Sequence, residues 1–266
     1  MTALRRSDDV AYDVQPQTTT RLLDWFEPIH DPGGILSRLV LRLDQLAVKR
    51  GVRLYPQTDF LALKAVVEAN RHHGTVLFQN MDPAFSRVGP DNALWIYGVD
   101  SDGRAATTQG GRYFDWTGTS LAEEVESFRY YYETPERHLT EECYAQVPRP
   151  AAEQIVGPAM ISGGIWVRPD LRGPNPDGIV LSQLLGRLTR LIGIARWWPD
   201  FVFTFSSNEL YKRGVVGNFG WTHHEFPFEI QLPRAPLYRG GLFWMTREEM
   251  LNWARREVVT QPGAAA

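Results

Sequence analysis

The sequence predicts an α/β fold in which helices flank a central sheet, and three patterns support this prediction. Apolar residues recur at three- and four-residue steps over 35–50 and again over 179–197, which is typical of a helix with one buried face. Between these segments, residues 93–99 and 104–116 are rich in aromatic and branched side chains and enclose an Asp-Gly turn. Two such segments around this turn indicate a β-hairpin.

The composition is that of a folded globular protein. The chain has 266 residues, 43% of them hydrophobic, so it can bury a core without disulfides or a structural metal. The formal net charge of −3 does not favour binding to a nucleic-acid backbone. The single cysteine, Cys143, excludes an internal disulfide and a cysteine-based zinc site, and no set of His, Asp and Glu has metal-ligand spacing.

The chain shows no pattern of a targeting or membrane segment. No apolar run follows the N-terminus, and the longest apolar stretches are too short to span a bilayer. We therefore expect a cytoplasmic protein that binds neither membrane nor nucleic acid and holds no metal.

The distribution of polar and apolar residues divides the chain into three parts. We expect a polar arm at 1–20, one domain at 21–258 and a flexible tail at 259–266. Within the domain, residues 21–90 are predicted to be helical, because two amphipathic patterns lie there. Residues 91–258 are predicted to hold the sheet and a binding core.

The remaining elements follow in order. A helix is predicted from Ser120 to about Tyr132, because Ser120 and Glu123 match a capping box, and a connector with prolines follows it. Further strands are expected at 159–167, 201–205, 219–224 and 242–245, and further helices at 207–213 and 246–256.

The loop between residues 168 and 178 has the features of an anion-binding turn. It joins a predicted strand to the long helix of 179–197 and contains Gly173 and Gly178. Free backbone N–H groups and the helix dipole favour an anion at such a helix start, and Arg172 could add a charged contact to phosphate. Many ordinary strand-to-helix turns share these features, so the loop by itself is a weak signal.

The order of segments around this loop resembles the GNAT superfamily of N-acetyltransferases. The resemblance begins with residues 166–169 (Trp-Val-Arg-Pro) and 170–173 (Asp-Leu-Arg-Gly). It continues with the Gly-Ile pair at 178–179, which opens the helix. Residues 208–215 are similar to the family's later Asn…Tyr segment. It covers about residues 90–245. The chain departs from the family in having four residues, 174–177, where one is usual, and an Asp177 carboxylate near phosphates would be repulsive unless it pointed away.

The resemblance implies a GNAT-like fold, with a mixed, mostly antiparallel, twisted sheet flanked by helices and an N-terminal helical extension. It also implies an N-acyltransferase that uses acetyl-CoA or another acyl-CoA, with no metal, and transfers the acyl group to an amine of a small molecule or peptide by direct attack. The coenzyme contacts that it implies are Trp166, Val167, Arg168, Arg172, Gly173, Gly178, Ile179, Leu181, Ser182 and Asn208.

The same resemblance implies catalytic candidates. Tyr211 is the candidate acid for the leaving thiolate. The candidate bases are His223, His224, Glu225 and Glu209, of which we favour His224 and Glu225. Because side chains alternate along a strand, at most one of the adjacent histidines should face the site.

The acceptor pocket is expected to use aromatic and cationic side chains. The candidates are Arg112, Tyr113, Trp116 and Trp221, with Trp166 and Trp244 as further tryptophans of this kind. The first 90 residues could cover this pocket or form the surface of a homodimer.

Two alternative functions remain open at this stage. One is a synthase that takes a long acyl chain from acyl-CoA or a carrier protein, which would suit the aromatic content of 12%. The other is a non-catalytic binding module that keeps the fold, and the altered loop at 174–177 favours it.

Overall fold

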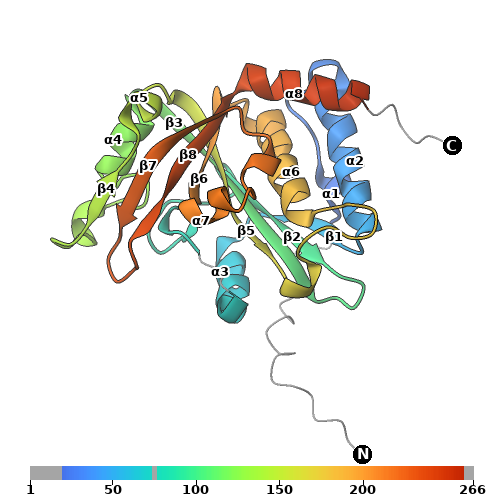
Figure 1. The fold of residues 1–266 in the computed structure, drawn as a ribbon, viewed down its shortest axis with the longest axis horizontal. Coiled ribbons are helices and arrows are strands. Elements are labelled where there is room, and N and C mark those ends of the chain that lie inside the picture. The colour runs from blue at the N-terminus through green and yellow to red at the C-terminus, as the bar shows by residue number, and fades with distance from the viewer. Residues whose placement is uncertain (1–19, 74–76, 261–266) are drawn as a thin grey trace, which may run out of the picture.

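The structure is a computed structural model that describes residues 20–73 and 77–260, so the predicted arm and tail lie almost entirely outside it. Within these residues one sheet of eight strands has the order β1-β2-β3-β5-β6-β8-β7-β4 (Figure 1). The strands are β1 Arg53–Gln57, β2 Ala93–Val99, β3 Ala105–Ser120, β4 Tyr144–Gln146, β5 Val156–Val167, β6 Phe201–Ser207, β7 His223–Gln231 and β8 Tyr238–Thr246. Neighbouring strands are antiparallel except for β5 and β6, which run parallel.

Helices cover both faces of this sheet (Figure 1). They are α1 Leu22–Trp25, α2 Ile35–Lys49, α3 Phe60–Ala69, α4 Leu121–Glu126, α5 Arg149–Ala152, α6 Leu181–Trp197, α7 Asn208–Lys212 and α8 Arg247–Thr260. One apolar cluster joins α1, α2, α6 and α8 to one face of the sheet, with Val40, Leu188 and Met250 among its members. A second cluster joins α3, α4 and α5 to the opposite face.

The predicted fold class is confirmed: the sheet is mixed and mostly antiparallel, and helices flank it. The local signals explain the ends of several helices. The Asp59 carboxylate accepts hydrogen bonds from the backbone N–H groups of Leu61 and Ala62, which fixes the start of α3. Ser120 and Glu123 form the capping box at the start of α4.

Three predicted elements are wrong in extent or type. The helical part at 21–90 also contains β1, whose Pro56 is tolerated because β1 is the edge strand of the sheet. The helix predicted to reach Tyr132 ends at Glu126, and Phe128 just beyond it has a φ of 62°. The connector that follows contains the short strand β4, which pairs with β7.

The strand predicted at 219–224 also needs correction. Residues Gly217–Phe219 form a short 3-10 helix, and Gly220 follows with a φ of 75°. The strand β7 begins only at His223 and continues to Gln231, so most of it lies beyond the predicted segment. The turn at Gly220 cannot be part of a strand, because its backbone is in the left-handed region.

Candidate active site

The site begins where the two parallel strands separate. Residues 159–161 of β5 pair with 201–203 of β6, and Ile161–Phe203 is the last pair. Beyond it, β5 continues along β3 to Val167, while β6 continues along β8 to Ser207. The facing edges of β5 and β6 are therefore no longer paired with each other past this point.

A bulge in β5 accompanies the separation. Thr108 of β3 is opposite Trp166 and Gly110 is opposite Gly163, so two residues of β5 face the single Gln109 of β3. One of the two is Gly164, which has a φ of 67°. A bulge of this kind bends its strand and increases the local twist, which directs β5 away from β6.

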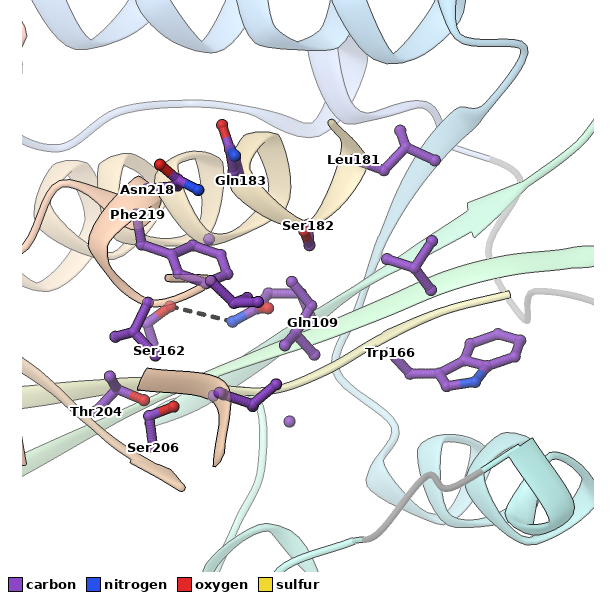
Figure 2. A pocket seen from close by; sticks show the side chains of 18 of the residues that line it. Gln109, Ser162, Trp166, Leu181, Ser182, Gln183, Thr204, Ser206, Asn218 and Phe219 are labelled. Atoms are coloured by element: carbon purple, nitrogen blue, oxygen red, sulfur yellow. Dashed lines mark hydrogen bonds between the residues drawn. The ribbon is translucent and has the colours of Figure 1, made fainter. Parts of the chain in front are cut away.

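A cavity of about 830 Å³ occupies the space between the separated strands. Its walls come from β5, β6, the start of α6 and the loop after α7, and Figure 2 shows the side chains around it. Members of both apolar clusters line it, among them Trp166 from one and Leu181 from the other. The cavity therefore reaches both faces of the sheet.

The start of α6 lies in the wall of this cavity. Leu181, Ser182 and Gln183 line it, and no side chain caps the N-terminal end of the helix at Val180. The first N–H groups of α6 are consequently without partners from a capping side chain, and the dipole of this 17-residue helix places partial positive charge there.

Of the four extra residues of the loop, Pro174 lines the cavity, and the other three form a closed turn outside its lining. Pro174 and Val180 form a β-bridge, and the Asn175 side-chain oxygen accepts a hydrogen bond from the Ile179 N–H at 2.8 Å. The Asp177 carboxylate lies 3.5 Å from Lys49 Nζ and does not line the cavity. The inserted carboxylate is therefore neutralised by a lysine outside the site.

In the described part of the chain, the charged side chains that line the cavity are arginines. Arg172 donates from Nε to the Val167 carbonyl at 2.9 Å, and Arg213 pairs with Glu209 at 3.4 Å. Arg190 is 1% exposed and lies over the Trp221 ring, with its guanidinium carbon 4.4 Å from the ring centroid. Of the three, Arg213 is already paired with a carboxylate, whereas Arg190 is buried.

Arg190 has no carboxylate partner among the described residues. It donates to the carbonyls of Gly186 and Phe219 and to the sulfur of Met245. Burial, and to a lesser extent the charge of Arg187, lowers the pKa of Arg190 to about 9. A buried cation held only by carbonyls, a thioether sulfur and an aromatic ring is unusual, and an anion in the cavity would stabilise it.

A polar pair lies opposite the bulge. The Gln109 Nε2 group donates to Ser162 Oγ at 3.1 Å, and Gln109 is only 2% exposed (Figure 2). The Gln109 Oε1 atom is buried and has no hydrogen-bond partner in the described part of the chain. An unpaired buried acceptor is costly, so this oxygen is suited to receive an N–H group from a bound molecule.

Part of the cavity lining is apolar and aromatic. Phe78, Trp166, Phe205 and Tyr238 line it together with Val67 of α3. Phe78 and Tyr238 are in edge-to-face contact, with ring centroids 6.2 Å apart. Burial raises the pKa of Tyr238, so its hydroxyl stays neutral at physiological pH.

Six of the ten predicted coenzyme contacts line the cavity and four do not. Those that line it are Trp166, Val167, Arg172, Gly173, Leu181 and Ser182. Those that lie elsewhere are Arg168, Gly178, Ile179 and Asn208. Arg168 is buried in ion pairs with Asp100 at 2.8 Å and Asp170 at 2.7 Å, so its charge is used within the fold.

The predicted catalytic residues gather beside this cavity. The Tyr211 hydroxyl is hydrogen-bonded to His224 Nε2, and neither residue lines the cavity, although Leu210 and Arg213 on either side of Tyr211 do. His223, His224 and Glu225 line a second, smaller hollow of about 360 Å³. The alternative base Glu209 pairs with Arg213.

Of the four predicted acceptor contacts, only Trp221 lines the cavity. Arg112 is buried and donates to the backbone carbonyls of Asn80 and Arg87, so it holds a loop in place. Tyr113 stacks on Trp197, with centroids 6.1 Å apart, and Trp116 is a core residue that is 4% exposed.

Gln109 and Arg190 are the important lining residues that sequence reasoning missed. Gln109 lies three residues before Arg112 on the predicted strand, and strand alternation gives no reason to prefer it. Arg190 lies within an otherwise apolar helical face, and this pattern was the one available signal.

Among the described residues, no helix is long and apolar enough to cross a membrane. The same residues contain no group of three or more His, Cys, Asp or Glu side chains placed to bind a metal ion.

Comparison with known proteins gives only distant similarity. No protein-family model matches the chain, and no curated protein is similar to it. One similar solved structure is an uncharacterized protein from Bacillus halodurans, at 11% identity and a TM-score of 0.38, with 79% of this chain and 91% of that chain covered. Another is Arabidopsis thaliana NAA60 in complex with a bisubstrate analogue, at 12% identity and a TM-score of 0.38, with 73% and 98% covered. Similarity at this level does not assign a function.

Proposed function

We propose that this protein is an N-acyltransferase that moves an acyl group from acyl-CoA to an amine by direct attack. The observation that supports the proposal is the separation of β5 and β6 past Ile161 and Phe203, over a cavity with the start of α6 in its wall. The resemblance to the GNAT superfamily implies such a separation at the coenzyme site. In the chain, α6 connects β5 to β6, and its start lines the cavity between them.

The residues present fit a molecule with an anionic end and an amide-containing arm. The N-terminal N–H groups of α6 and the Arg172 and Arg213 guanidiniums would hold phosphate oxygens. The unpaired edge of β5 from Ser162 to Trp166 offers backbone groups to the amides of the arm. Asp177, the feature of the loop that would repel phosphate, is paired with Lys49 outside the cavity.

The proposed chemistry needs alignment of two reactants. Acyl-CoA supplies a thioester whose carbonyl carbon is the electrophile. The separated strands would hold this carbonyl against a backbone N–H, which stabilises the developing oxyanion, and would bring the amine nitrogen within reach. The C–N bond forms, the C–S bond breaks, and the proton lost by the amine balances the thiolate that leaves.

Tyr211 is our proposed acid for the thiolate. α7 borders the cavity through Leu210, but the Tyr211 hydroxyl is bonded to His224. This role therefore requires Tyr211 to leave His224 by a change of side-chain rotamer. His224 and Glu225, the proposed bases, would have to act from the second hollow through water.

The apolar part of the cavity lining favours a second candidate function. Val67, Phe78, Phe205 and Tyr238 would accommodate a long acyl chain as well as an acceptor. A synthase of N-acyl amino acids or signal molecules would use the same coenzyme site and differ in its preferred donor.

Calorimetric titration with acetyl-CoA and with a long-chain acyl-CoA tests these functions. Micromolar binding of acetyl-CoA supports the first, and clear preference for the long chain supports the second. Binding of neither contradicts both and favours a non-catalytic module or a carrier-protein donor. Acetyl transfer to a panel of small amines and peptides, measured by release of free thiol, then identifies the acceptor type.

A further inference from the structure

We propose that Arg190 binds a carboxylate carried by one of the two reactants, either by the acyl group of the donor or by the acceptor amine. This inference rests on the acyltransferase function proposed above and names the substrate class of that site, which is a dicarboxylic acyl group or an amino acid. It draws on three properties of Arg190: its buried charge, its N–H groups without acceptors, and its position beside the point where β5 and β6 separate.

The charge of Arg190 is buried without a negative partner. Arg190 is 1% exposed and lines the cavity, and none of the described residues that line the cavity is Asp or Glu. The pKa of Arg190, about 9, leaves the side chain cationic at neutral pH. Burial of a cation without a counter-charge is unfavourable. A carboxylate in the cavity would neutralise this charge and would meet no like charge in the described part of the lining.

The guanidinium of Arg190 has more N–H groups than acceptors. A guanidinium carries five N–H groups, two of them on each Nη atom. Nε donates to the Gly186 carbonyl, Nη2 to the Phe219 carbonyl and Nη1 to the Met245 sulfur, which is a weak acceptor. One N–H on each Nη atom therefore has no acceptor among the described residues. Two N–H groups in one plane, on neighbouring nitrogens, suit the two oxygens of a carboxylate.

Arg190 lies beside the separation of the strands and away from the proposed phosphate contacts. Its Nη1 atom is 3.3 Å from the sulfur of Met245. Met245 pairs with Val202, which in turn pairs with Met160, one residue before the last β5–β6 pair. Ser182, at the start of α6, precedes Arg190 by eight residues, or about 12 Å along a helix axis. Arg190 is therefore available to the reacting end of the ligands, which the proposed function assigns to the separated strands.

Calorimetry with two donors tests whether the acyl group carries the carboxylate. Succinyl-CoA and butyryl-CoA have acyl chains of equal length, and the carboxylate of the first replaces the terminal methyl group of the second. If the donor is the source, succinyl-CoA should bind at least about tenfold more tightly than butyryl-CoA, because a charge-assisted pair with Arg190 forms only with the carboxylate.

Amino acids test the acceptor in the same way. Alanine, leucine and phenylalanine are each compared with the corresponding amino alcohol, in which a hydroxymethyl group replaces the carboxylate. The rise in melting temperature of protein saturated with coenzyme A measures their binding. If the acceptor is the source, at least one amino acid should bind about tenfold or more tightly than its alcohol.

The two sets of ligands separate failure of the inference from failure of the proposed function. Binding of coenzyme A without preference for the carboxylate in either set overturns the inference and leaves the acyltransferase function standing. Failure of coenzyme A and of all the acyl-CoA donors to bind overturns the function, and the inference with it.

Substitution of Arg190 tests the contact itself. Arg190→Met should abolish the preference for the carboxylate, with the affinity for coenzyme A unchanged and the melting temperature equal or higher, because an unpaired buried cation is removed. Arg190→Lys keeps a charge but loses the planar pair of N–H groups, so about a threefold preference should remain. Arg187→Met is the matched control, because Arg187 lies on the same helix outside the lining.

Three results in these variants overturn the contact. One is the wild-type preference retained in folded Arg190→Met, or in Arg190→Lys where the methionine variant does not fold. Another is a lower melting temperature with unchanged ligand preference, which assigns Arg190 to the fold alone. The third is a loss of affinity for coenzyme A itself in the Arg190 variants but not in Arg187→Met, which assigns Arg190 to the coenzyme.

Discussion

The Tyr211 hydroxyl lies 3.1 Å from His224 Nε2, beside the cavity and outside its lining. The two rings also pack together, with centroids 5.3 Å apart, and both contact Phe243. This pairing joins the proposed acid to one of the proposed bases before any substrate binds. Single substitutions of Tyr211 and of His224 can therefore test the proposed acid and the proposed base one at a time.

Tyr211→Phe should lower kcat, with little change in the affinity for acetyl-CoA, if Tyr211 protonates the thiolate. His224→Phe should lower kcat if His224 is the base; if Glu225 is the base, it should leave kcat unchanged or raise it, because it releases the tyrosine hydroxyl from its present partner. Steady-state kinetics together with calorimetry measure both quantities. Unchanged kcat in Tyr211→Phe would contradict the acid role. A large loss of kcat in His224→Phe would show that the histidine acts as a base.

Ser182→Glu should weaken acetyl-CoA binding by at least about tenfold, because it adds a negative charge where α6 begins in the cavity wall. The same charge is favourable to the helix, since anions near a helix N-terminus stabilise it. The melting temperature should therefore stay the same or rise while calorimetry shows the loss. Retained affinity would mean that the phosphates bind elsewhere.

Gly240→Ala should destabilise the fold by about 3 kcal/mol, because a Cβ at this position of β8 would collide with the backbone of Ser206 in β6. Urea unfolding measures the change as a lower midpoint at constant slope. Gly217→Ala is the control, since a Cβ there meets no atom within 4 Å. Equal midpoints for the two variants would contradict the close approach of β6 and β8.

The stability of the fold should fall in acid as Asp100 is protonated. Burial raises the pKa of Asp100, but hydrogen bonds from the Arg104 backbone and from Arg168 outweigh burial, so the folded pKa lies below its usual value. The contribution of the Asp100 carboxylate to the free energy of unfolding is thus complete above the pKa of the unfolded state, about 4, and is lost as pH falls through the pKa of the folded state.

Asp100→Asn should cost about 2 kcal/mol at neutral pH and should flatten this acid dependence, because Arg168, 5% exposed, loses a charged partner. Urea unfolding at several pH values measures both effects. Asp102→Asn is the control, since the Asp102 side chain is 66% exposed and pairs with Arg104 at the surface. If Asp102→Asn lowered the free energy of unfolding as much as Asp100→Asn does, the buried ion pair would be contradicted.

Local signals predicted most of the sheet and its helices. The Asp-Gly turn and the segments rich in aromatic and branched residues around it predicted the β2–β3 hairpin, and the apolar spacing of 179–197 predicted α6, because both signals depend on neighbours along the chain. The strand β1 was not predicted, because Pro56 and Arg53 are not typical strand residues. Its conformation depends on pairing with β2. The three-residue β4 likewise exists only through its pairing with β7.

The candidate site was predictable in part. Arg172, Gly173 and Ser182 follow one another on a loop and a helix start, so local order placed them together. Gln109 lies more than 50 residues from Ser162, and only the β3–β5 pairing brings their side chains within 3.1 Å. Arg112 and Trp116 had the right chemistry for a pocket, but they are used in the fold, since neither residue lines the cavity.

The sequence by itself determined the class of fold, the glycine loop and the helix that follows it, because turn chemistry and apolar periodicity act over a few residues. Only the tertiary structure decided that β5 separates from β6 after Ile161 and Phe203. The same is true of the ion pair between Asp177 and Lys49 and of the hydrogen bond between Tyr211 and His224. Each of these depends on the register of distant strands or on contacts between distant side chains. Packing of the whole chain sets such relationships, and no local pattern records them.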